Sequence, residues 1–391
     1  MDTDLQTFLD LVQVPGEPGS EAAVIERIRG MLLAMGVPVA CMAQDETQAQ
    51  SEYGGEAGNL IVRLDGTGRG ERRMLSTHVD TVPIAVGSKP RVEGDRVVND
   101  AADHALGADA RAGCAILLAA VRALMDRRDN HPPRTFVFFV QEEVGLVGSR
   151  GLDVALLGDP TPAMCFNYDG SETPEIVTAI IGTERFEIEI TGVPAHGGRP
   201  QQGISTITIA ANALAELDRE EWNGRIERGD VWGTANLGLV RGGQGSNVVM
   251  PDFYGLAESR SHDLAFRRRI VETWQAAFET AVAAANDRAI EADGRASVAF
   301  KPGPAYDPYR LPEDAPVVRA AVAALERCGV APRLVRNDGG MDCNHIVAKG
   351  IPAVGMGTGH RGAHSVDEHL DIPDFVAACR AAVVLATGEA S

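Results

Sequence analysis

The sequence lacks a long hydrophobic run, a basic N-terminal segment and a compact set of paired cysteines. No apolar run approaches the length needed to span a bilayer. The N-terminus, Met-Asp-Thr-Asp, has neither the basic segment nor the apolar core of a signal peptide. The six cysteines are scattered, several of them in apolar stretches, which favours reduced buried thiols over disulfides or a thiolate zinc site. We therefore expect a cytoplasmic protein.

Basic residues are outnumbered, with 36 Lys and Arg against 55 Asp and Glu and a net charge of −19. This balance argues against binding of a nucleic-acid backbone, which requires a basic surface. The length of 391 residues predicts two domains. The chain contains no internal repeat and no low-complexity segment.

Most of the chain has the pattern of an α/β domain with a mostly parallel sheet. Short, continuous apolar runs are typical of strands that are buried on both faces. They lie at 73–76, 135–140, 163–166 and 351–356. Helical spacing of apolar residues predicts helices at 5–12, 21–35, about 110–127, 316–328 and 373–387.

A different pattern begins near residue 183. Residues 185–191 alternate apolar and polar side chains, as in a strand with one solvated face. Helices are expected at 204–217 and 264–286, and strands at 235–240, 252–259 and 297–301. This β-α-β-β-α-β order predicts a ferredoxin-like α+β domain. The expected division is a first domain of residues 1–182 and 303–391, interrupted by an inserted domain of residues 183–302.

Side chains that can bind metal follow four of the predicted buried strands. They are His78 with Asp80, Glu142 with Glu143, Asp169, and His364. In a largely parallel sheet, ligands collect beyond the carboxyl ends of the strands, so we expect these residues to converge. Nitrogen and oxygen donors without thiolates suit zinc, with manganese or cobalt as close substitutes.

Each of these residues also has a simpler interpretation. Asp109, flanked by glycine and alanine at a predicted helix start, has the pattern of an N-cap. A single histidine is often a loop residue, and a Glu-Glu pair is often solvated. However, Glu142 and Glu143 directly follow a buried run, where an idle carboxylate pair would be costly. One of them could bind metal while the other takes a proton from a metal-bound water. Asp80 could orient the imidazole of His78.

Together these residues resemble a known family. The motifs His78-x-Asp80-Thr, Gly-Ala-Asp109, Glu142-Glu143, Asp169-Gly and His364-Ser are similar to those of the cocatalytic zinc peptidases that include peptidase T, carboxypeptidase G and aminoacylase. The resemblance extends over essentially the whole chain. Gly339-Gly-Met-Asp342 and the segment from Gly359 to His364 resemble the peptidase T-like members most.

The resemblance implies a role for each residue. Asp109 would bridge two zinc ions, His78 and Asp169 would complete one site, and Glu143 and His364 would complete the other. Glu142 would be the general base and later the acid that protonates the leaving amine. Asp80 would support catalysis by orienting His78. The resemblance also implies that the Asp109–Ala110 peptide bond is cis.

The inserted domain would act as a lid and a dimerisation domain. His196 resembles the family's lid histidine, which helps to stabilise the oxyanion and often reaches the site of a partner subunit. Asn247 and Arg260 resemble its substrate-binding residues, and the guanidinium of Arg260 would suit a carboxylate. Alternatively, Asn247 only satisfies a turn and Arg260 pairs with an acid on its own sheet. Because the family's lid histidine often reaches a partner's site, a homodimer is expected.

The activity expected from the resemblance is that of an aminopeptidase on short peptides, similar to a tripeptidase. In this family, an aspartate at the position of Asp169 tends to occur in aminopeptidases and dipeptidases, whereas a glutamate there occurs in carboxypeptidases and aminoacylases. The tendency has exceptions among amino-acid deacylases. An N-acyl amino acid deacylase or a carboxypeptidase is the alternative within the family. A non-catalytic metal-binding scaffold is the alternative from another class, and a zinc phosphoesterase is weaker because no basic cluster accompanies the ligands.

Overall fold

A computed structural model describes residues 3–127 and 130–388. The chain forms two compact units, a first unit of Met1–Ala179 and Arg310–Ser391 and a second unit of Ile180–Tyr309. The boundaries expected after residues 182 and 302 fall inside strands β9 (Gly182–Thr191) and β13 (Ser297–Tyr306). These two strands pair with each other along most of their length, so the units divide outside them.

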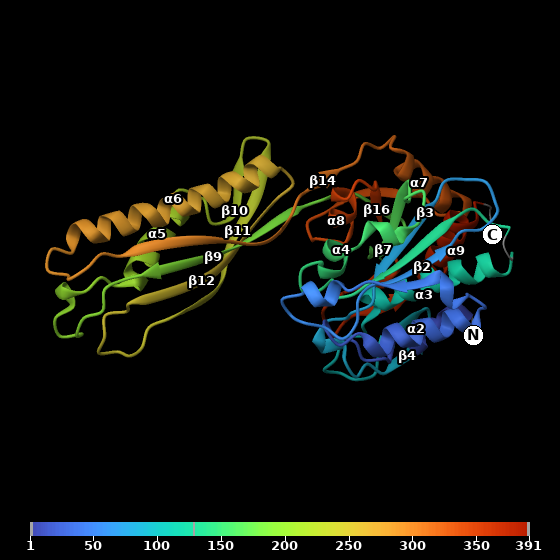
Figure 1. Ribbon diagram of the computed structural model, residues 1–391, viewed down its shortest axis with the longest axis horizontal. Coiled ribbons are helices and arrows are strands. Elements are labelled where there is room, and N and C mark those ends of the chain that lie inside the picture. The colour runs from blue at the N-terminus through green and yellow to red at the C-terminus, as the bar shows by residue number, and fades with distance from the viewer. Residues whose placement is uncertain (1–2, 128–129, 389–391) are drawn as a thin grey trace. The chain divides into compact units, whose positions relative to one another are not determined.

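The first unit is built on a mixed sheet whose centre is parallel (Figure 1). Its main path runs through β1 (Met42–Gln44), β2 (Leu60–Leu64), β6 (Arg134–Phe139), β3 (Arg73–His78), β7 (Met164–Gly170), β16 (Ala353–Gly357), β8 (Glu175–Ile180) and β14 (Tyr309–Arg310), and β15 (Arg333–Asn337) also pairs with β8. Strands β6, β3, β7 and β16 are mutually parallel. The flanking pairs β1–β2, β2–β6 and β16–β8 are antiparallel. The expected parallel arrangement is thus confirmed for the central strands.

Helices cover this sheet, and the longer ones share its hydrophobic core. They are α1 (Thr3–Val12), α2 (Ala22–Ala34), α3 (Ala108–Met125), α4 (Val147–Gly151), α7 (Pro316–Arg327), α8 (Cys343–Ala348) and α9 (Ile372–Thr387), with 3-10 turns at Val39–Cys41, Thr47–Gln50, Pro83–Ala85 and Val154–Leu157. Helices α3 and α9 pack together and both contact β3. Gly113 permits the close approach of α3, because a Cβ there would lie 2.1 Å from Thr77 Oγ1 and 2.3 Å from the Tyr168 carbonyl oxygen.

A small antiparallel sheet joins two segments that the sequence does not predict to form strands. Its order is β17 (His360–Arg361), β18 (His369–Asp371), β5 (Arg96–Asn99) and β4 (Pro90–Glu93). These strands are short and mostly half-buried or exposed, with Val97 and Leu370 among their few buried side chains. Such strands carry too little apolar alternation to be recognised from sequence. The sheet joins the segment before Asp109 to the segment that contains His364.

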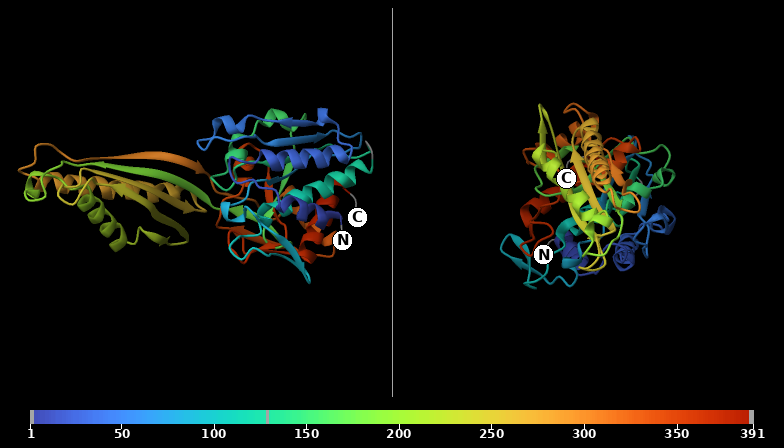
Figure 2. Two further views of the ribbon diagram at one scale, coloured as in Figure 1. Left: turned by 90° about the horizontal axis from the view of Figure 1, so that it is seen from below. Right: turned by 90° about the vertical axis from the view of Figure 1, so that its left-hand side faces the viewer.

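The second unit is a five-stranded antiparallel sheet in the order β10 (Gly224–Arg228), β11 (Val231–Gly242), β12 (Asp252–Ser261), β9 and β13. Helices α5 (Thr206–Arg219) and α6 (Leu264–Arg288) lie against one side of this sheet (Figures 1 and 2). A 3-10 turn covers Pro200–Gln202. The ferredoxin-like order is confirmed, with β10 as an additional edge strand. Only Ile226 of β10 is buried, which is why the sequence does not predict this strand.

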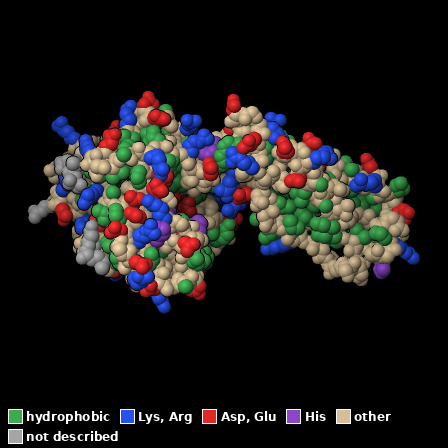
Figure 3. Space-filling model, turned by 180° about the vertical axis from the view of Figure 1, so that it is seen from behind, with side chains coloured by type: hydrophobic (Ala, Val, Ile, Leu, Met, Phe, Trp, Pro, Cys, Tyr) green, Lys and Arg blue, Asp and Glu red, His purple; other side chains and the backbone are tan. Residues whose placement is uncertain are grey.

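Charged side chains of both signs lie on the surface of the first unit. In Figure 3 the acidic and basic side chains of the first unit are interspersed over the visible face. Among the described residues, no helix has both the length and the apolar character that crossing a membrane requires.

Candidate active site

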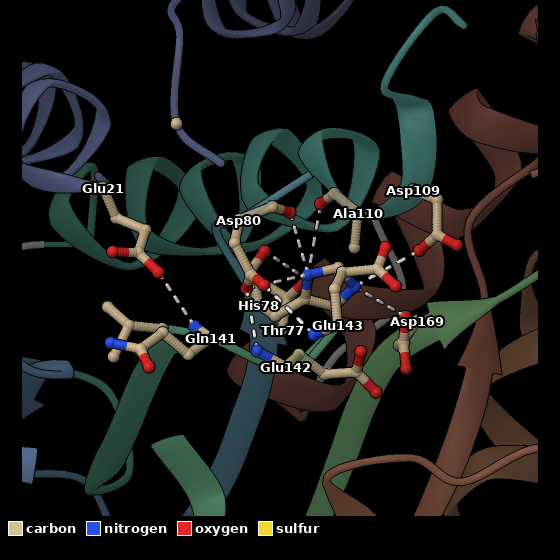
Figure 4. A network of polar contacts seen from close by, with 12 residues as sticks. Glu21, Thr77, His78, Asp80, Asp109, Ala110, Gln141, Glu142, Glu143 and Asp169 are labelled. Carbon is tan, nitrogen blue, oxygen red and sulfur yellow. Dashed lines mark hydrogen bonds and ion pairs between the residues drawn. The ribbon is translucent and has the colours of Figure 1, made fainter. Parts of the chain in front are cut away.

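The carboxyl ends of the central parallel strands bring the predicted ligands together (Figure 4). His78 is the last residue of β3, and Asp169 is the second-last residue of β7. Glu142 and Glu143 follow β6, while His364 lies in the segment after β16. The chain passes from β3 to β6 on one side and returns to β7 on the other, so the residues gather at a topological switch point.

His78 lies between two carboxylates. Its Nε2 atom is 3.2 Å from Asp109 Oδ1 and 3.1 Å from Asp169 Oδ1. The His78 side chain is only 1% exposed, so these contacts are almost fully desolvated. Burial lowers the pKa of His78, but Asp169, Asp109 and Asp80 together raise it well above its usual value. A cationic group is therefore strongly favoured at this point between the carboxylates.

Asp109 faces a second group through its other oxygen. His364 Nε2 lies 3.3 Å from Asp109 Oδ2 and 2.9 Å from Glu143 Oε1. The Asp109–Ala110 peptide bond is cis, as the resemblance implied. Asp109 and Ala110 have non-helical backbone angles, and the start of α3 has no side-chain cap. The interpretation of Asp109 as an N-cap is thus wrong, because its two oxygens point to His78 and His364 instead.

Asp80 contacts both His78 and the Glu142–Glu143 backbone, whereas the sequence predicts only the contact with His78. The Nδ1 atom of His78 lies 3.0 Å from the backbone oxygen of Asp80 and 3.4 Å from its Oδ1. The orientation of His78 therefore depends on the backbone of Asp80 as well as its carboxylate. That carboxylate also accepts the backbone N–H of Glu142 at 3.0 Å and of Glu143 at 3.1 Å (Figure 4). A single residue thus positions the end of β3 and the Glu-Glu segment.

Glu142 and Glu143 have different surroundings. Glu143 contacts His364, whereas within the described residues the Glu142 carboxylate makes no side-chain hydrogen bond. Burial raises the pKa of Glu142 well above its usual range, a shift that the nearby His78 opposes and Asp169 reinforces. A carboxylate of raised pKa accepts and releases protons near neutral pH more readily than an ordinary glutamate.

The donor chemistry suits divalent cations. Three groups of side chains place one ligand atom each within 4.8 Å of one another: His78, Asp109 and Asp169; Asp109, Glu143 and His364; and His78, Glu142 and Glu143. The first two groups share Asp109. The nearby thiol of Cys114 donates to the backbone oxygen of His78 at 3.3 Å and is not aimed into the groups. Imidazole and carboxylate donors of this kind fit zinc, manganese or cobalt.

The second unit brings together two of its three predicted residues. His196 and Asn247 are exposed neighbours, because Gly197 N–H donates to the Asn247 carbonyl and His196 pairs with Val248. Arg260 is eight residues from the start of β12, roughly 27 Å along the strand from the His196 end of the sheet. Its guanidinium pairs with Glu258 on the same strand, with Nε 2.8 Å from Oε1 and Nη2 3.3 Å from Oε2. In this structure Arg260 therefore pairs with an acid on its own sheet, which is the alternative to substrate binding.

Two buried carboxylates near the site are not predicted by the sequence. Glu21 Oε1 accepts the backbone N–H groups of Gly19 at 2.9 Å and Gln141 at 3.0 Å. Glu368 accepts the backbone N–H groups of Gly107 and Asp109. Glu368 is four residues after His364, and Glu21 directly precedes α2. Neither lies at the end of a predicted strand, and the residues on either side of each are half-buried or exposed, so no sequence pattern marks them.

Comparison with known proteins agrees with this geometry. The sequence pattern that defines Peptidase family M20/M25/M40 matches residues 74–387, which include every candidate ligand. The chain belongs to this peptidase family. It is accordingly a hydrolase of peptide or amide bonds.

Relatives within the family extend over nearly the whole chain. The Bacillus subtilis (strain 168) protein YqjE is 32% identical over 373 residues, covering 95% of this chain and 94% of the relative. A Mycobacterium tuberculosis (strain H37Rv) protein with the provisional name succinyl-diaminopimelate desuccinylase DapE is 28% identical, covering 94% and 93%.

Two solved structures are similar to both units. A tripeptidase from Staphylococcus aureus subsp. aureus Mu50 matches with a TM-score of 0.83 and 27% identity, covering 98% of this chain and 96% of that one. The aminopeptidase PepT from Bacillus cereus ATCC 10987 matches with a TM-score of 0.81 and 30% identity, covering 99% and 98%. The resemblance to peptidase T-like members is thereby confirmed.

Proposed function

We propose that the protein is a dinuclear zinc aminopeptidase that acts on short peptides. The observation that carries the proposal is the shared carboxylate, since the two oxygens of Asp109 face two separate donor groups. A carboxylate with one oxygen directed to each group is suited to bridging two cations.

The residues divide between two cation sites. His78, Asp109 and Asp169 would hold one zinc ion, and Asp109, Glu143 and His364 would hold the other. Manganese or cobalt would fit the same donors. When bound, the two cations would polarise the scissile carbonyl group and lower the pKa of water at the site.

Glu142 is the proposed general base. Of the two adjacent glutamates, Glu143 is engaged by His364, which leaves the carboxylate of Glu142 available to a water molecule. Glu142 would take a proton from the water that attacks the carbonyl carbon. It would return that proton to the amine nitrogen as the carbon–nitrogen bond breaks. Asp80 would hold the backbone of Glu142 during both transfers.

Short peptides with a free amino terminus are the proposed substrates. The tripeptidase and PepT names of the two similar structures support this choice. The aspartate at position 169 supports it further, through the family tendency described above. A deacylase acting on N-acyl amino acids is the second candidate, supported by the name of the Mycobacterium relative.

A substrate panel separates these candidates. It contains free tripeptides, their N-acetylated and C-amidated forms, and N-acetyl and N-succinyl amino acids, with products identified by mass spectrometry. We expect release of the N-terminal residue from free tripeptides and loss of turnover on N-acetylation. Turnover of N-acyl amino acids alone would contradict the peptidase proposal, and release of the C-terminal residue would support a carboxypeptidase.

We also propose that the second unit is a lid and that the protein is a homodimer. His196 and Asn247 lie at one end of the lid sheet and Arg260 at the other, so one lid is poorly arranged to offer all three residues to one short substrate. Lids from two copies would resolve this, with His196 acting on the partner's substrate. Arg260 would then have to exchange Glu258 for a substrate carboxylate. The cytoplasm is the compartment that we propose, because the scattered cysteines favour reduced thiols.

A further inference from the structure

Glu368 connects the loop of His364 to the segment of Asp109, and neither of these two candidate ligands lies on a strand. Its side chain is 2% exposed. Oε2 accepts the backbone N–H of Gly107 at 2.6 Å, and Oε1 accepts the backbone N–H of Asp109 at 3.0 Å. Both carboxylate oxygens are therefore used on the segment that presents Asp109, and Glu368 itself follows His364 in the same loop.

The Asp109 segment needs such support because its backbone does not form regular helix. Gly107 has a left-handed φ of 80°, and Asp109 and Ala110 have non-helical angles. The N–H groups of Gly107 and Asp109 consequently have no helical acceptor, and a buried carboxylate supplies one for each. Rotation of this segment would redirect both oxygens of Asp109.

The other ligand connected through Glu368 is His364, which has a φ of 64° and is 51% exposed. The Glu368 N–H donates to the Ser365 carbonyl at 3.1 Å, so the loop folds back on itself between the two residues. By contrast, His78 and Asp169 belong to the adjacent parallel strands β3 and β7. The Asp109–Glu143–His364 group thus depends on loop geometry more than the His78–Asp109–Asp169 group does.

We propose that Glu368 is a positioning residue that ties the His364 loop to the backbone of Asp109 and sets the cation affinity of the Asp109–Glu143–His364 group. The proposal rests on the proposed function only in taking these side chains as metal ligands. Glu368 would not touch metal or substrate. Residues that orient metal ligands in this way typically change metal affinity 10–100-fold when they are replaced.

The test is a zinc titration of the intact, metal-stripped protein. Zinc binding is measured by isothermal titration calorimetry and by competition with a chelator. E368Q keeps the size of the side chain but turns an amide NH₂ toward one of the two backbone N–H groups. We expect the second zinc equivalent to bind about 10–100-fold more weakly in E368Q, and the first to weaken less, because strands β3 and β7 still hold His78 and Asp169 in place. E368A should show the same loss, and E368Q carries the test if E368A does not fold.

The matched control is D45N. Asp45 is also a buried carboxylate of the first unit, and its Oδ1 accepts the N–H groups of Thr47 at 3.2 Å and Asn59 at 2.9 Å, neither of which is a candidate ligand. D45N should leave both zinc equivalents unchanged, and an equal loss in D45N would overturn the proposal. Normal binding of both equivalents by folded E368Q and E368A would also overturn it. If the wild type binds fewer than two zinc ions, the dinuclear function fails together with this proposal. Titration without substrate keeps the result independent of the peptidase assignment.

Discussion

The carboxylate of Asp80 holds the backbone of Glu142, with Asp80 Oδ1 3.0 Å from the Glu142 nitrogen. Its second oxygen holds the nitrogen of Glu143 at 3.1 Å, and the Asp80 side chain is fully buried. His78, a candidate metal ligand, is only two residues away, so Asp80 connects it to Glu142, the candidate base. The spacing of His78 and Glu142 is therefore set by the short segment that follows β3.

Replacing Asp80 with asparagine should weaken catalysis without removing any proposed metal ligand. In D80N, an amide NH₂ would face one of the two backbone N–H groups, which leaves that N–H without an acceptor. We expect kcat to fall about 10–100-fold, in line with other residues that orient ligands. Steady-state kinetics and zinc content are the measurements. Unchanged kcat in a folded D80N protein would show that this carboxylate does not position Glu142.

Removing the carboxylate of Glu142 should strongly reduce turnover while zinc remains bound. General acid–base catalysis contributes about 10²–10⁴-fold, so E142Q should lose activity within that range. E313Q, which alters an exposed glutamate, is the control and should behave as the wild type. Full hydrolysis by zinc-loaded E142Q would assign the base to another residue.

Asp109 should matter to both cation sites, and His364 to only one. A ligand that binds the folded state alone raises its stability by about 2.7 kcal/mol at one hundred times its dissociation constant. We expect zinc to raise the melting temperature of metal-stripped wild type strongly, of H364A partly and of D109A little. Thermal melts with and without zinc measure this, and E142Q should respond as the wild type. Equal responses of H364A and D109A would argue against a shared carboxylate.

The sequence predicts the central strands and the ligand set because both have strong local signals. The buried runs that end at His78, before Glu142 and at Asp169 occupy parallel neighbouring strands, as their composition indicated. The helical spacing of Ile270, Trp274 and Phe278 likewise marks the core face of α6. Such patterns depend on neighbouring residues, which a sequence displays directly.

What the sequence does not predict depends on contacts between distant segments. Glu368 meets Asp109 across 259 positions, and Glu21 meets Gln141 across 120. The case of Arg260 is different, because the sequence already places it on the same strand face as Glu258 but leaves open whether its guanidinium binds Glu258 or a substrate carboxylate. Only the folded arrangement decides among them.

Glu21 should give the folding stability a measurable pH dependence. Burial raises its pKa from 4.5 to about 7 in the folded protein, against the opposing effect of the Gly19 and Gln141 N–H groups. The folded state therefore binds the proton more tightly than the unfolded state. The stabilisation is full below pH 4.5 and is lost as the pH rises to about 7, by up to about 3 kcal/mol. Urea denaturation of wild type and E21Q between pH 5 and pH 8 measures this contribution. The stability of the wild type relative to E21Q should fall over that range, and a difference independent of pH would contradict the assignment.

Mixing two inactive variants tests the proposed sharing of lids between subunits. In a dimer of an E142A chain and an H196A chain, the H196A chain keeps Glu142 and receives His196 from the E142A partner. That site is complete, whereas the other site lacks both residues. If the chains assort at random, about a quarter of wild-type activity per chain should return, because half of the dimers are mixed and each has one complete site. Co-expression with two affinity tags isolates the mixed dimer, and light scattering verifies its size. If His196 acts within its own chain, the mixture should show only the average of the two variants. A monomeric protein whose H196A variant retains full turnover would exclude the shared lid altogether.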